Sequence, residues 1–323
     1  MDLETHQKIK LAMAQSQRPM IVSHGRPDGD TMGAGLAMYF AFNDLGKTAF
    51  LFSKDKIEAQ FLFFKEVDNY SSSIAKAIEF RPDFIFFVDC ADLRMSGFDL
   101  LLGQFERVKT INIDHHASNT MYGDINLIES RASSACEVVY HLFKNIGIGI
   151  TSRIATFLFL GIFTDTSNFS NAATTPECLY DAAELWRYGI FVSEIKDNLL
   201  KNKTISFLKL WGIAMARIKY NEELKIASTY VRKDDIVSLG LEGDSVEGLS
   251  NFLNANLNVE TIVVLKELGD GVIRGSLRTT SNDIDLAKVA KVFGGGGHKK
   301  ASGFSVKGQI KTIGETWALD ISN

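Results

Sequence analysis

Short apolar runs alternate with longer segments of helical periodicity in the first half of the chain. Continuous apolar runs of this length predict buried strands, and we expect them at residues 20–22, 48–52, 84–88, 108–113 and 125–128. Helical spacing of apolar residues predicts helices at residues 4–17, 31–45, 133–145 and 152–163. Thr31 and Ser152 are the residue types expected to cap two of these helices.

Strands that alternate with helices predict a doubly wound α/β domain with a mostly parallel sheet. Ligands of such sheets bind beyond the carboxyl ends of the strands. His24, Asp89 and Asp114 each follow one of the predicted strands. We therefore expect the fold to bring these three side chains together.

The second half of the chain predicts helices first and then a smaller α/β domain. Helical patterns dominate residues 175–218, apart from a charged interruption at 194–203. Further strands are expected at 224–231, 261–268, 272–277 and from 303, and further helices near 246–253 and 284–292. The glycines at 269 and 271 predict a hairpin between two of the strands. We predict a catalytic domain at 1–190, a helical linker at 191–219 and a substrate-binding domain at 220–323, with the active site in the interdomain cleft.

Composition limits the classes of protein to which the chain can belong. The chain has 323 residues, 46% of them hydrophobic and 23% charged, as expected for a globular protein of two domains. A net charge of -4 disfavours a protein that coats long nucleic acid, but allows a local cationic pocket for a small anion. Three scattered cysteines predict a reducing compartment. No apolar stretch is long enough for a membrane span, so we expect a cytoplasmic protein that does not bind membranes.

Four segments carry candidate metal ligands. His24, Asp28 and Asp30 lie within seven residues that the pattern places on a loop. Asp89 ends a buried strand and could bridge two metals, and Asp165 follows a helix C-terminus, where a nearby cation would stabilise it. Each aspartate also has a structural alternative: a helix N-terminus for Asp30, a turn cap for Asp89 and a surface position for Asp165.

The fourth segment is Asp114-His115-His116. Neighbouring side chains in an extended segment point in opposite directions. We therefore expect one histidine to bind metal and the other to face substrate. Asp114 could orient a histidine without contacting the metal itself.

The whole set offers carboxylates and imidazoles but no thiolate, which favours Mn²⁺ or Mg²⁺ over a structural zinc. Four or more carboxylates near one point repel one another unless cations are present. Two adjacent metal ions are the usual means of hydrolysing a phosphate ester. The sequence therefore favours a two-metal phosphoesterase.

A glycine-rich segment, Gly294 to Gly297, precedes His298. Successive glycine amides can surround an anion, and His298 and Arg278 could add charge-assisted bonds to phosphate. A flexible hinge is the alternative interpretation. Lys299 and Lys300 are expected to form a solvated surface pair.

These five motifs, in this order, resemble the DHH phosphoesterases with a DHH-associated C-terminal domain, and the resemblance covers nearly the whole chain. A chain this short resembles the group of nanoRNases and 3′-phosphoadenosine 5′-phosphate phosphatases. Ser167 and Ala34 stand where the family often has Gly and Ser, but neither is expected to be a ligand.

The resemblance implies two Mn²⁺ ions, with Mg²⁺ or Co²⁺ as alternatives. One ion would be bound by His24 and Asp28, the other by Asp30, His115 and Asp165, and both by the bridging Asp89. His116 would contact the scissile phosphate, which makes His116 and Asp89 the catalytic residues. A substrate phosphate or terminal nucleotide would be held by Arg278, Gly296, Gly297, His298 and Ser302.

The expected activity is hydrolysis of short oligoribonucleotides (nanoRNA), of 3′-phosphoadenosine 5′-phosphate, or of both, to nucleoside monophosphates by a metal-activated water. A cyclic di-AMP or linear pApA phosphodiesterase is the nearest alternative, and a non-catalytic nucleotide-binding protein is an alternative of another class. An inorganic pyrophosphatase and a processive exonuclease such as RecJ are disfavoured. The expected partner is short RNA or a small nucleotide. The oligomeric state stays open, with a homodimer as one candidate.

Overall fold

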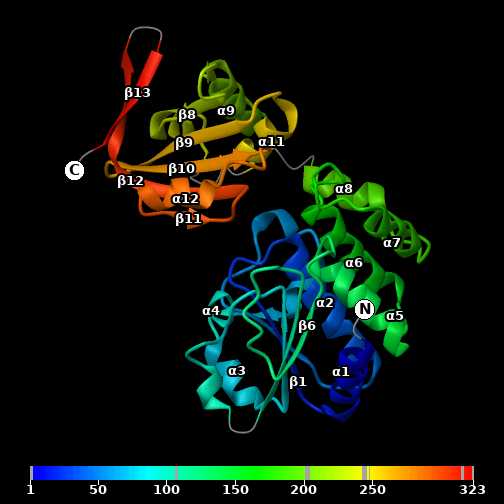
Figure 1. Cartoon of the computed structure of the whole chain (residues 1–323). Helices are drawn as coiled ribbons and strands as arrows, with labels where there is room; N and C mark the ends of the chain where they lie inside the picture. Colours follow the sequence, from blue (N-terminus) through cyan, green and yellow to red (C-terminus); the bar gives the residue numbers. More distant parts are fainter. Residues whose placement is uncertain are drawn as a thin grey trace. The chain divides into compact units, whose positions relative to one another are not determined.

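The chain forms two compact units, Met1–Asn202 and Lys203–Asn323 (Figure 1). The structure is a computed structural model, and it describes residues 3–105, 108–200, 204–241, 246, 248–313 and 316–321. None of the helices in these ranges has both the length and the apolar character needed to cross a lipid bilayer.

The first unit is built on a six-stranded sheet with the order β3-β2-β1-β4-β5-β6. The strands are β1 (Pro19–Ser23), β2 (Phe50–Ser53), β3 (Tyr70–Ser71), β4 (Phe84–Val88), β5 (Lys109–Asp114) and β6 (Ile125–Ile128). All neighbouring pairs are parallel. Ser23 pairs with Val88, and Val88 with Ile113, so the central strands end at one level. The predicted doubly wound parallel sheet is confirmed.

Helices cover both faces of this sheet (Figure 1). They are α1 (Leu3–Gln15), α2 (Gly29–Asp44), α3 (Ile74–Phe80), α4 (Leu93–Ser96), α5 (Ala135–Ile146), α6 (Ser152–Asp165), α7 (Pro176–Trp186) and α8 (Val192–Leu200), with short 3-10 turns at Ala59–Phe61, Lys65–Asn69 and Leu102–Gln104. Ile21 of β1 packs into one apolar core with α1, α2, α5 and α6, while Met20 and Val22 pack into the core on the other face. This alternation explains why the central strands are apolar throughout.

The expected starts of two helices are wrong. Helix α2 begins at Gly29 because Asp28, rather than Thr31, caps it by accepting bonds from the amides of Asp30 and Thr31. Asp30 therefore lies in the first helical turn and not on a loop. Thr151, not Ser152, caps α6, since its hydroxyl accepts a bond from the amide of Ile154.

The charged interruption expected at 194–203 contains most of helix α8, and residues 201–203 lie outside the described ranges. The helix forms because Ile195 and Leu199 pack on the core of the first unit. Between them, Lys196 is exposed and Asp197 is half-buried.

The second unit has a seven-stranded mixed sheet with the order β11-β12-β10-β9-β8-β7, and β13 pairs with β12. Its strands are β7 (Lys219–Asn221), β8 (Ile226–Val231), β9 (Thr261–Gly269), β10 (Val272–Thr279), β11 (Gly296–Gly297), β12 (Ala301–Ile313) and β13 (Thr316–Ile321). Its helices are α9 (Ile205–Ala216), α10 (Lys233–Ser238), α11 (Leu249–Asn256) and α12 (Leu286–Val292). The predicted β9–β10 hairpin is confirmed, whereas β7, α10 and β13 were not expected.

Helix α9 belongs to the core of the second unit. Its residues Leu210, Trp211 and Ala214 pack with Ala227 of β8 and Ile262 of β9. The range predicted for a linker, 191–219, includes this helix. The predicted domain boundaries and the interdomain cleft stay predictions.

Candidate metal centre

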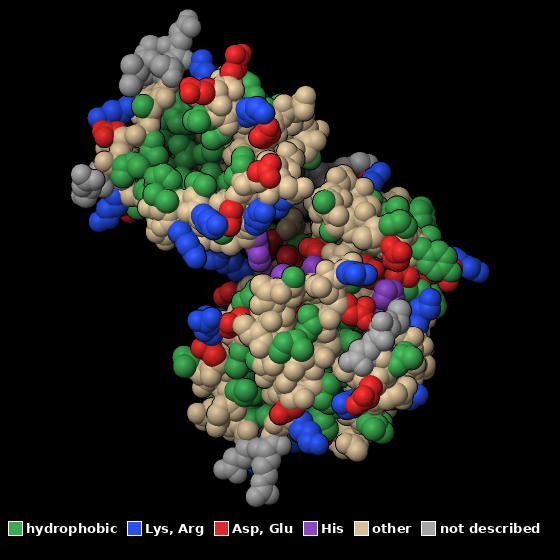
Figure 2. Space-filling model, in the orientation of Figure 1, with side chains coloured by type: hydrophobic (Ala, Val, Ile, Leu, Met, Phe, Trp, Pro, Cys, Tyr) green, Lys and Arg blue, Asp and Glu red, His purple; other side chains and the backbone are tan. Residues whose placement is uncertain are grey.

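The candidate ligands of the first unit meet at the carboxyl edge of its sheet. His24 and Asp89 directly follow β1 and β4, and Asp114 is the last residue of β5. Within the described residues, three groups of potential ligand atoms form here, with the atoms of each group within 4.8 Å of one another. The groups are His24, Asp28 and Asp89; Asp30, His115 and Asp165; and Asp89, Asp114, His115 and His116. In Figure 2, acidic and histidine side chains lie together on the surface of the first unit.

In the first group, His24 Nε2 lies 3.4 Å from Asp89 Oδ2. The Nδ1 atom of the same ring lies 2.6 Å from the carbonyl oxygen of Gly25. Since a carbonyl oxygen can only accept a hydrogen bond, Nδ1 carries a proton. The neutral ring therefore keeps its lone pair on Nε2, the nitrogen that faces the carboxylates, and this is the form that binds a metal.

In the second group, His115 Nε2 faces two carboxylates. It lies 3.8 Å from Asp30 Oδ2 and 3.6 Å from Asp165 Oδ2. The Asp30 carboxylate accepts bonds from the amides of Ala135 (2.6 Å) and Cys136 (2.9 Å), the first two residues of α5. A helix N-terminus stabilises a carboxylate in this position, so α5 holds Asp30 in place.

Asp89 belongs to the first and third groups. Its Oδ2 faces His24, while its Oδ1 lies 3.8 Å from His115 Nε2 and 3.5 Å from His116 Nδ1. Oδ1 is buried and has no hydrogen-bond partner among the described residues. The backbone of Asp89 is left-handed, with φ 55°, a conformation that is costly for a residue other than glycine. An orphaned buried oxygen of this kind fits a carboxylate that binds a cation.

Asp114 orients His116 by a hydrogen bond to its ring. Asp114 is fully buried, and its Oδ1 accepts bonds of 2.8 Å from His116 Nδ1 and from the amide of His115. Its Oδ2 accepts a bond of 2.6 Å from Asn119 Nδ2, a residue that the sequence did not single out. The hydrogen bond to Asp114 raises the pKa of His116 to about 9.

The sequence predicted that the side chains of His115 and His116 point in opposite directions. This prediction is wrong. Their ring centroids are 4.5 Å apart, and both rings have a nitrogen within 3.8 Å of Asp89 Oδ1. The reason is that β5 ends at Asp114, so the alternation of a strand does not continue through His115 and His116. Whether the two rings have different roles stays a prediction.

The electrostatics of the cluster favour cations. Burial, reinforced by the negative charge of Asp89, raises the pKa of Asp30 to about 7. Burial and the charge of Asp30 raise the pKa of Asp165 to about 9, and burial also raises the pKa of Asp28. Carboxylates in such a cluster bind either protons or metal ions. Oxygen and imidazole donors without a thiolate suit hard divalent ions.

Three glycines allow α2 and α6 to approach closely at this site. A side chain at Gly29 would collide with Thr164, and one at Gly33 with the carbonyl oxygen of Phe157. A side chain at Gly161 would collide with the Asp30 carboxylate. The two antiparallel helices carry Asp30 near the start of α2 and Asp165 at the end of α6, so glycine packing sets the place of both acids.

In the second unit, sheet pairing brings most of the predicted substrate-binding residues together. Arg278 of β10 pairs with Ala301 of β12, and the next residue of β12, Ser302, pairs with Gly297 of β11. The Ser302 hydroxyl donates a 2.7 Å bond to the carbonyl oxygen of His298, so it shapes the turn. Gly296, also in β11, is exposed and has open space around it.

Two nitrogens of the Arg278 guanidinium donate hydrogen bonds within the protein. Its Nε donates a 2.6 Å bond to Asn251 Oδ1, and Nη1 donates a 2.8 Å bond to the carbonyl oxygen of Leu277. These bonds fix the plane of the guanidinium. Burial lowers the pKa of Arg278, which is consistent with a half-buried position.

Two glycines of the segment Gly294–Gly297 have structural roles, and so does Lys300. Gly294 has φ 71° at the end of α12, and a side chain at Gly295 would collide with Gly303 and Phe304. The prediction that Lys300 is solvated is wrong. Its ammonium donates to the carbonyl oxygens of residues 280 and 281 and to the side chain of residue 282, because β12 brings the turn against that loop.

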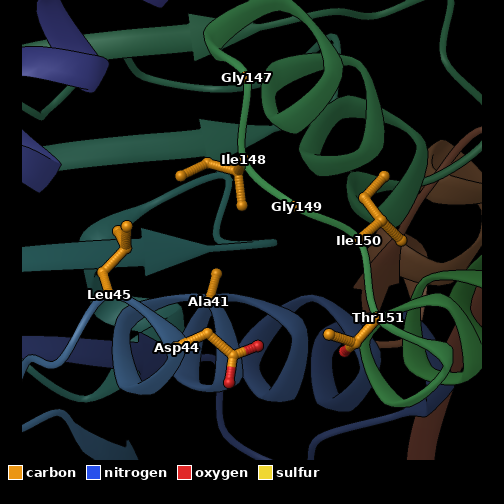
Figure 3. A pocket seen from close by; sticks show the side chains of 8 residues that line it. All are labelled: Ala41, Asp44, Leu45, Gly147, Ile148, Gly149, Ile150 and Thr151. Atoms are coloured by element: carbon orange, nitrogen blue, oxygen red, sulfur yellow. The ribbon is translucent and has the colours of Figure 1, made fainter.

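A separate pocket of about 350 Å³ lies at the opposite end of α2 (Figure 3). It is lined by Ala41, Asp44, Leu45, Gly147, Ile148, Gly149, Ile150 and Thr151. The distance along the helix to the candidate ligands is about 20 Å, at 1.5 Å per residue. With one carboxylate and otherwise mostly apolar side chains, it offers no catalytic group.

Residues 18–162 match the DHH family, N-terminal domain, and residues 223–316 match the DHHA1 domain. The bifunctional oligoribonuclease and PAP phosphatase NrnA of Thermus thermophilus is 30% identical over 290 residues, which cover 89% of this chain and 84% of that protein. The chain belongs to the DHH family. The predicted family and enzyme class, a phosphoester hydrolase, are confirmed.

Other relatives agree with this assignment. The probable bifunctional oligoribonuclease and PAP phosphatase NrnA of Streptococcus mutans is 26% identical over 92% of each chain. The crystal structure of an exopolyphosphatase-related protein from Bacteroides fragilis has a TM-score of 0.86, covering 93% of this chain and 90% of that one. At 22% identity, it shows a shared fold.

Proposed function

We propose that this DHH-family hydrolase converts short oligoribonucleotides and 3′-phosphoadenosine 5′-phosphate to nucleoside monophosphates. The observation that carries the proposal is the arrangement around Asp89. One buried carboxylate directs its two oxygens at two separate groups of ligands, which is the arrangement that a pair of bridged metal ions requires. The choice of substrates is supported by the names of the Thermus and Streptococcus relatives.

The donor set fits two divalent ions, and we propose Mn²⁺. His24, Asp28 and Asp89 would hold one ion, and Asp30, His115, Asp165 and the other oxygen of Asp89 the second. Bound ions of this kind supply Lewis acidity and neutralise the charge of the transferred phosphoryl group. The protein contributes the spacing of the ligands, through the strand ends and the N-terminus of α5.

His116 is proposed to contact the scissile phosphate. The bond between its Nδ1 and Asp114 fixes the ring, and Nε2 would face the substrate. The Asp114 hydrogen bond raises the pKa of His116 to about 9 in the metal-free protein, which favours the cationic form of the ring. A cationic ring donates a charge-assisted hydrogen bond from Nε2 to a phosphoryl oxygen.

The second unit is proposed to hold the terminal phosphate of the substrate. Asn251 and the Leu277 carbonyl fix the Arg278 guanidinium, which has further N–H groups beyond those two bonds for a phosphate. The exposed His298 and the amides of Gly296 and Gly297 would complete the anion site. Ser302 would contribute by fixing the carbonyl group of His298.

A substrate panel tests the proposal. Purified protein with Mn²⁺ is expected to hydrolyse a diribonucleotide and 3′-phosphoadenosine 5′-phosphate faster than cyclic di-AMP or RNA of 24 nucleotides or more. Chelation should abolish turnover, and added Mn²⁺ should restore it. Absence of hydrolysis of both favoured substrates would refute the proposal, and faster cleavage of cyclic di-AMP or linear pApA would reassign the substrate.

The predicted cell compartment and the oligomeric state of the enzyme also belong to this proposal. A cytoplasmic location agrees with three buried free cysteines, which are stable in a reducing compartment. Cell fractionation would test the location. Light scattering coupled to gel filtration would decide between a monomer and a homodimer.

A further inference from the structure

Thr31 lies among the ligands proposed for the first ion, although its residue type did not suggest a role in the site. It is the third residue of α2, and its side chain is fully buried. The hydroxyl oxygen lies 2.5 Å from His24 Nε2, 3.0 Å from Asp28 Oδ1 and 2.5 Å from Asp89 Oδ2. A single hydroxyl group thus touches all three side chains of this group.

The first turn of α2 does not need this hydroxyl. Asp28 already caps the helix by accepting bonds from the amides of residues 30 and 31. A threonine hydroxyl near a helix start commonly bonds to backbone groups nearby. The partners of Thr31 are instead the side chains of His24 and Asp89, which follow β1 and β4, and of the cap itself. The hydroxyl is therefore directed at the ligand group and not at the helix start.

We propose that the Thr31 hydroxyl positions His24, Asp28 and Asp89 for one divalent cation. The inference rests on the proposed function, because it assumes that these three side chains bind an ion. A hydroxyl has a single proton, so at any moment it donates to one of these three atoms, and the bond can pass from one to another. Because all three side chains lie within reach of the same hydroxyl, it keeps them turned toward a common point before the ion binds.

The backbone around Thr31 makes the hydroxyl a rigid support. Threonine has few side-chain rotamers in a helix because two heavy atoms branch at Cβ. Tyr70, which is tied to Ser23 of β1 by a 3.0 Å hydrogen bond, lies against the Thr31 carbonyl oxygen. Without the hydroxyl, Asp28 and Asp89 would have to be reoriented when the ion binds, which lowers affinity. Loss of a group that orients metal ligands typically costs about 10- to 100-fold in affinity.

The test is a Mn²⁺ titration by calorimetry, with binding rather than turnover as the readout. Thr31→Val keeps the shape of the side chain and removes the hydroxyl, whereas Thr31→Ser keeps the hydroxyl. We expect the Val variant to bind one of two ions about 10- to 100-fold more weakly and the other unchanged, and the Ser variant to match the wild type. Thr31→Ala serves as a second hydroxyl-free variant if the Val variant does not fold.

Thr229→Val is the matched control. Thr229 is equally buried, but it lies in the second unit, and its hydroxyl donates to the Ala214 carbonyl oxygen. Its loss should lower the melting temperature and leave both Mn²⁺ affinities unchanged.

The outcomes separate the two proposals. If the wild type binds no Mn²⁺, the proposed two-metal function fails. If the wild type binds two ions and the hydroxyl-free variants bind both as well as the wild type does, or bind either one more tightly, the role of Thr31 is refuted. An equal loss of affinity at both ions would also refute it, because that result indicates a general structural effect.

Discussion

Metal binding at the second ligand group should release protons and strengthen steeply with pH. Burial and neighbouring carboxylates raise the pKa of Asp30 to about 7 and that of Asp165 to about 9 in the metal-free protein. An ion must displace these protons, because only the ionised carboxylate is a ligand. At pH 7, roughly half of Asp30 and roughly 1% of Asp165 would be ionised, and at pH 8 roughly 90% and 10%.

The product of these fractions rises about 17-fold between pH 7 and pH 8, and the apparent affinity should rise with it. The Asp165 side chain is 33% exposed, so water screens part of the effect, and we expect a gain of at least about fivefold. The two acids together should release about 1.5 protons per ion at pH 7. Calorimetric titration with Mn²⁺ in two buffers of different ionisation enthalpy counts these protons directly. An affinity that does not change from pH 6 to pH 8, with less than about half a proton released, would refute the reasoning.

The same shifts set the stability of the metal-free protein. The pKa values of Asp30 and Asp165 are higher in the folded chain than the usual 3.8, so the folded state binds more protons than the unfolded one. Burial lowers the pKa of His24, but the hydrogen bond and charge of Asp89 outweigh this effect and raise it to about 9. Stability should therefore fall as pH rises, through about 7 for Asp30 and towards about 9 for Asp165 and His24. Thermal unfolding with chelator at pH 6, 7.5 and 9 would show the fall, and saturating Mn²⁺ should reverse it. A melting temperature that rises with pH in chelator would contradict the assignment.

Three substitutions test other parts of the site. Asp89→Asn should reduce kcat by more than about 1,000-fold while the metal-free protein still unfolds cooperatively, and near-normal turnover would exclude a bridging carboxylate. Asn251→Ala removes a bond to a charged group and should raise KM about tenfold at nearly constant kcat, since it releases Arg278; an effect on kcat alone would contradict this role. Lys300→Met should lower the melting temperature and raise KM because the ammonium ties a loop to the His298 turn. Lys299→Met, which changes the exposed neighbouring lysine, is the matched control, and equal effects of both lysine variants would argue against a structural role for Lys300.

The fold of the first unit could be predicted because its central strands are buried on both faces. Runs such as residues 84–88 are apolar throughout for that reason, and His24 and Asp89 follow two such strands while Asp114 ends a third. The topology of a parallel sheet then brings these residues to one edge. Local pattern, strand ends and polar residue type together were enough to predict which side chains gather there.

Features that depend on contacts distant in sequence could not be predicted. Thr31 contacts Asp89, which lies 58 residues later in the chain, only after the chain has folded. Lys300 had the same local pattern as its exposed neighbour, and its three oxygen acceptors lie about 20 residues earlier in the chain. The directions of the two adjacent histidines depended on where β5 ends, and strand ends are the least predictable part of a strand.

The glycine contacts between α2 and α6 have a consequence for the evolution of metal preference. Gly33 touches no candidate ligand, yet any side chain there would push apart two helices that each carry one of the acids. Because Asp30 moves with α2 and Asp165 with α6, the separation of these two carboxylates is tied to the thickness of an apolar interface. A methyl group added at Gly33, which is not a ligand, could thus change the ion size that the site prefers, while every ligand is kept. Relatives that share all the ligands could in this way differ in the ion they select.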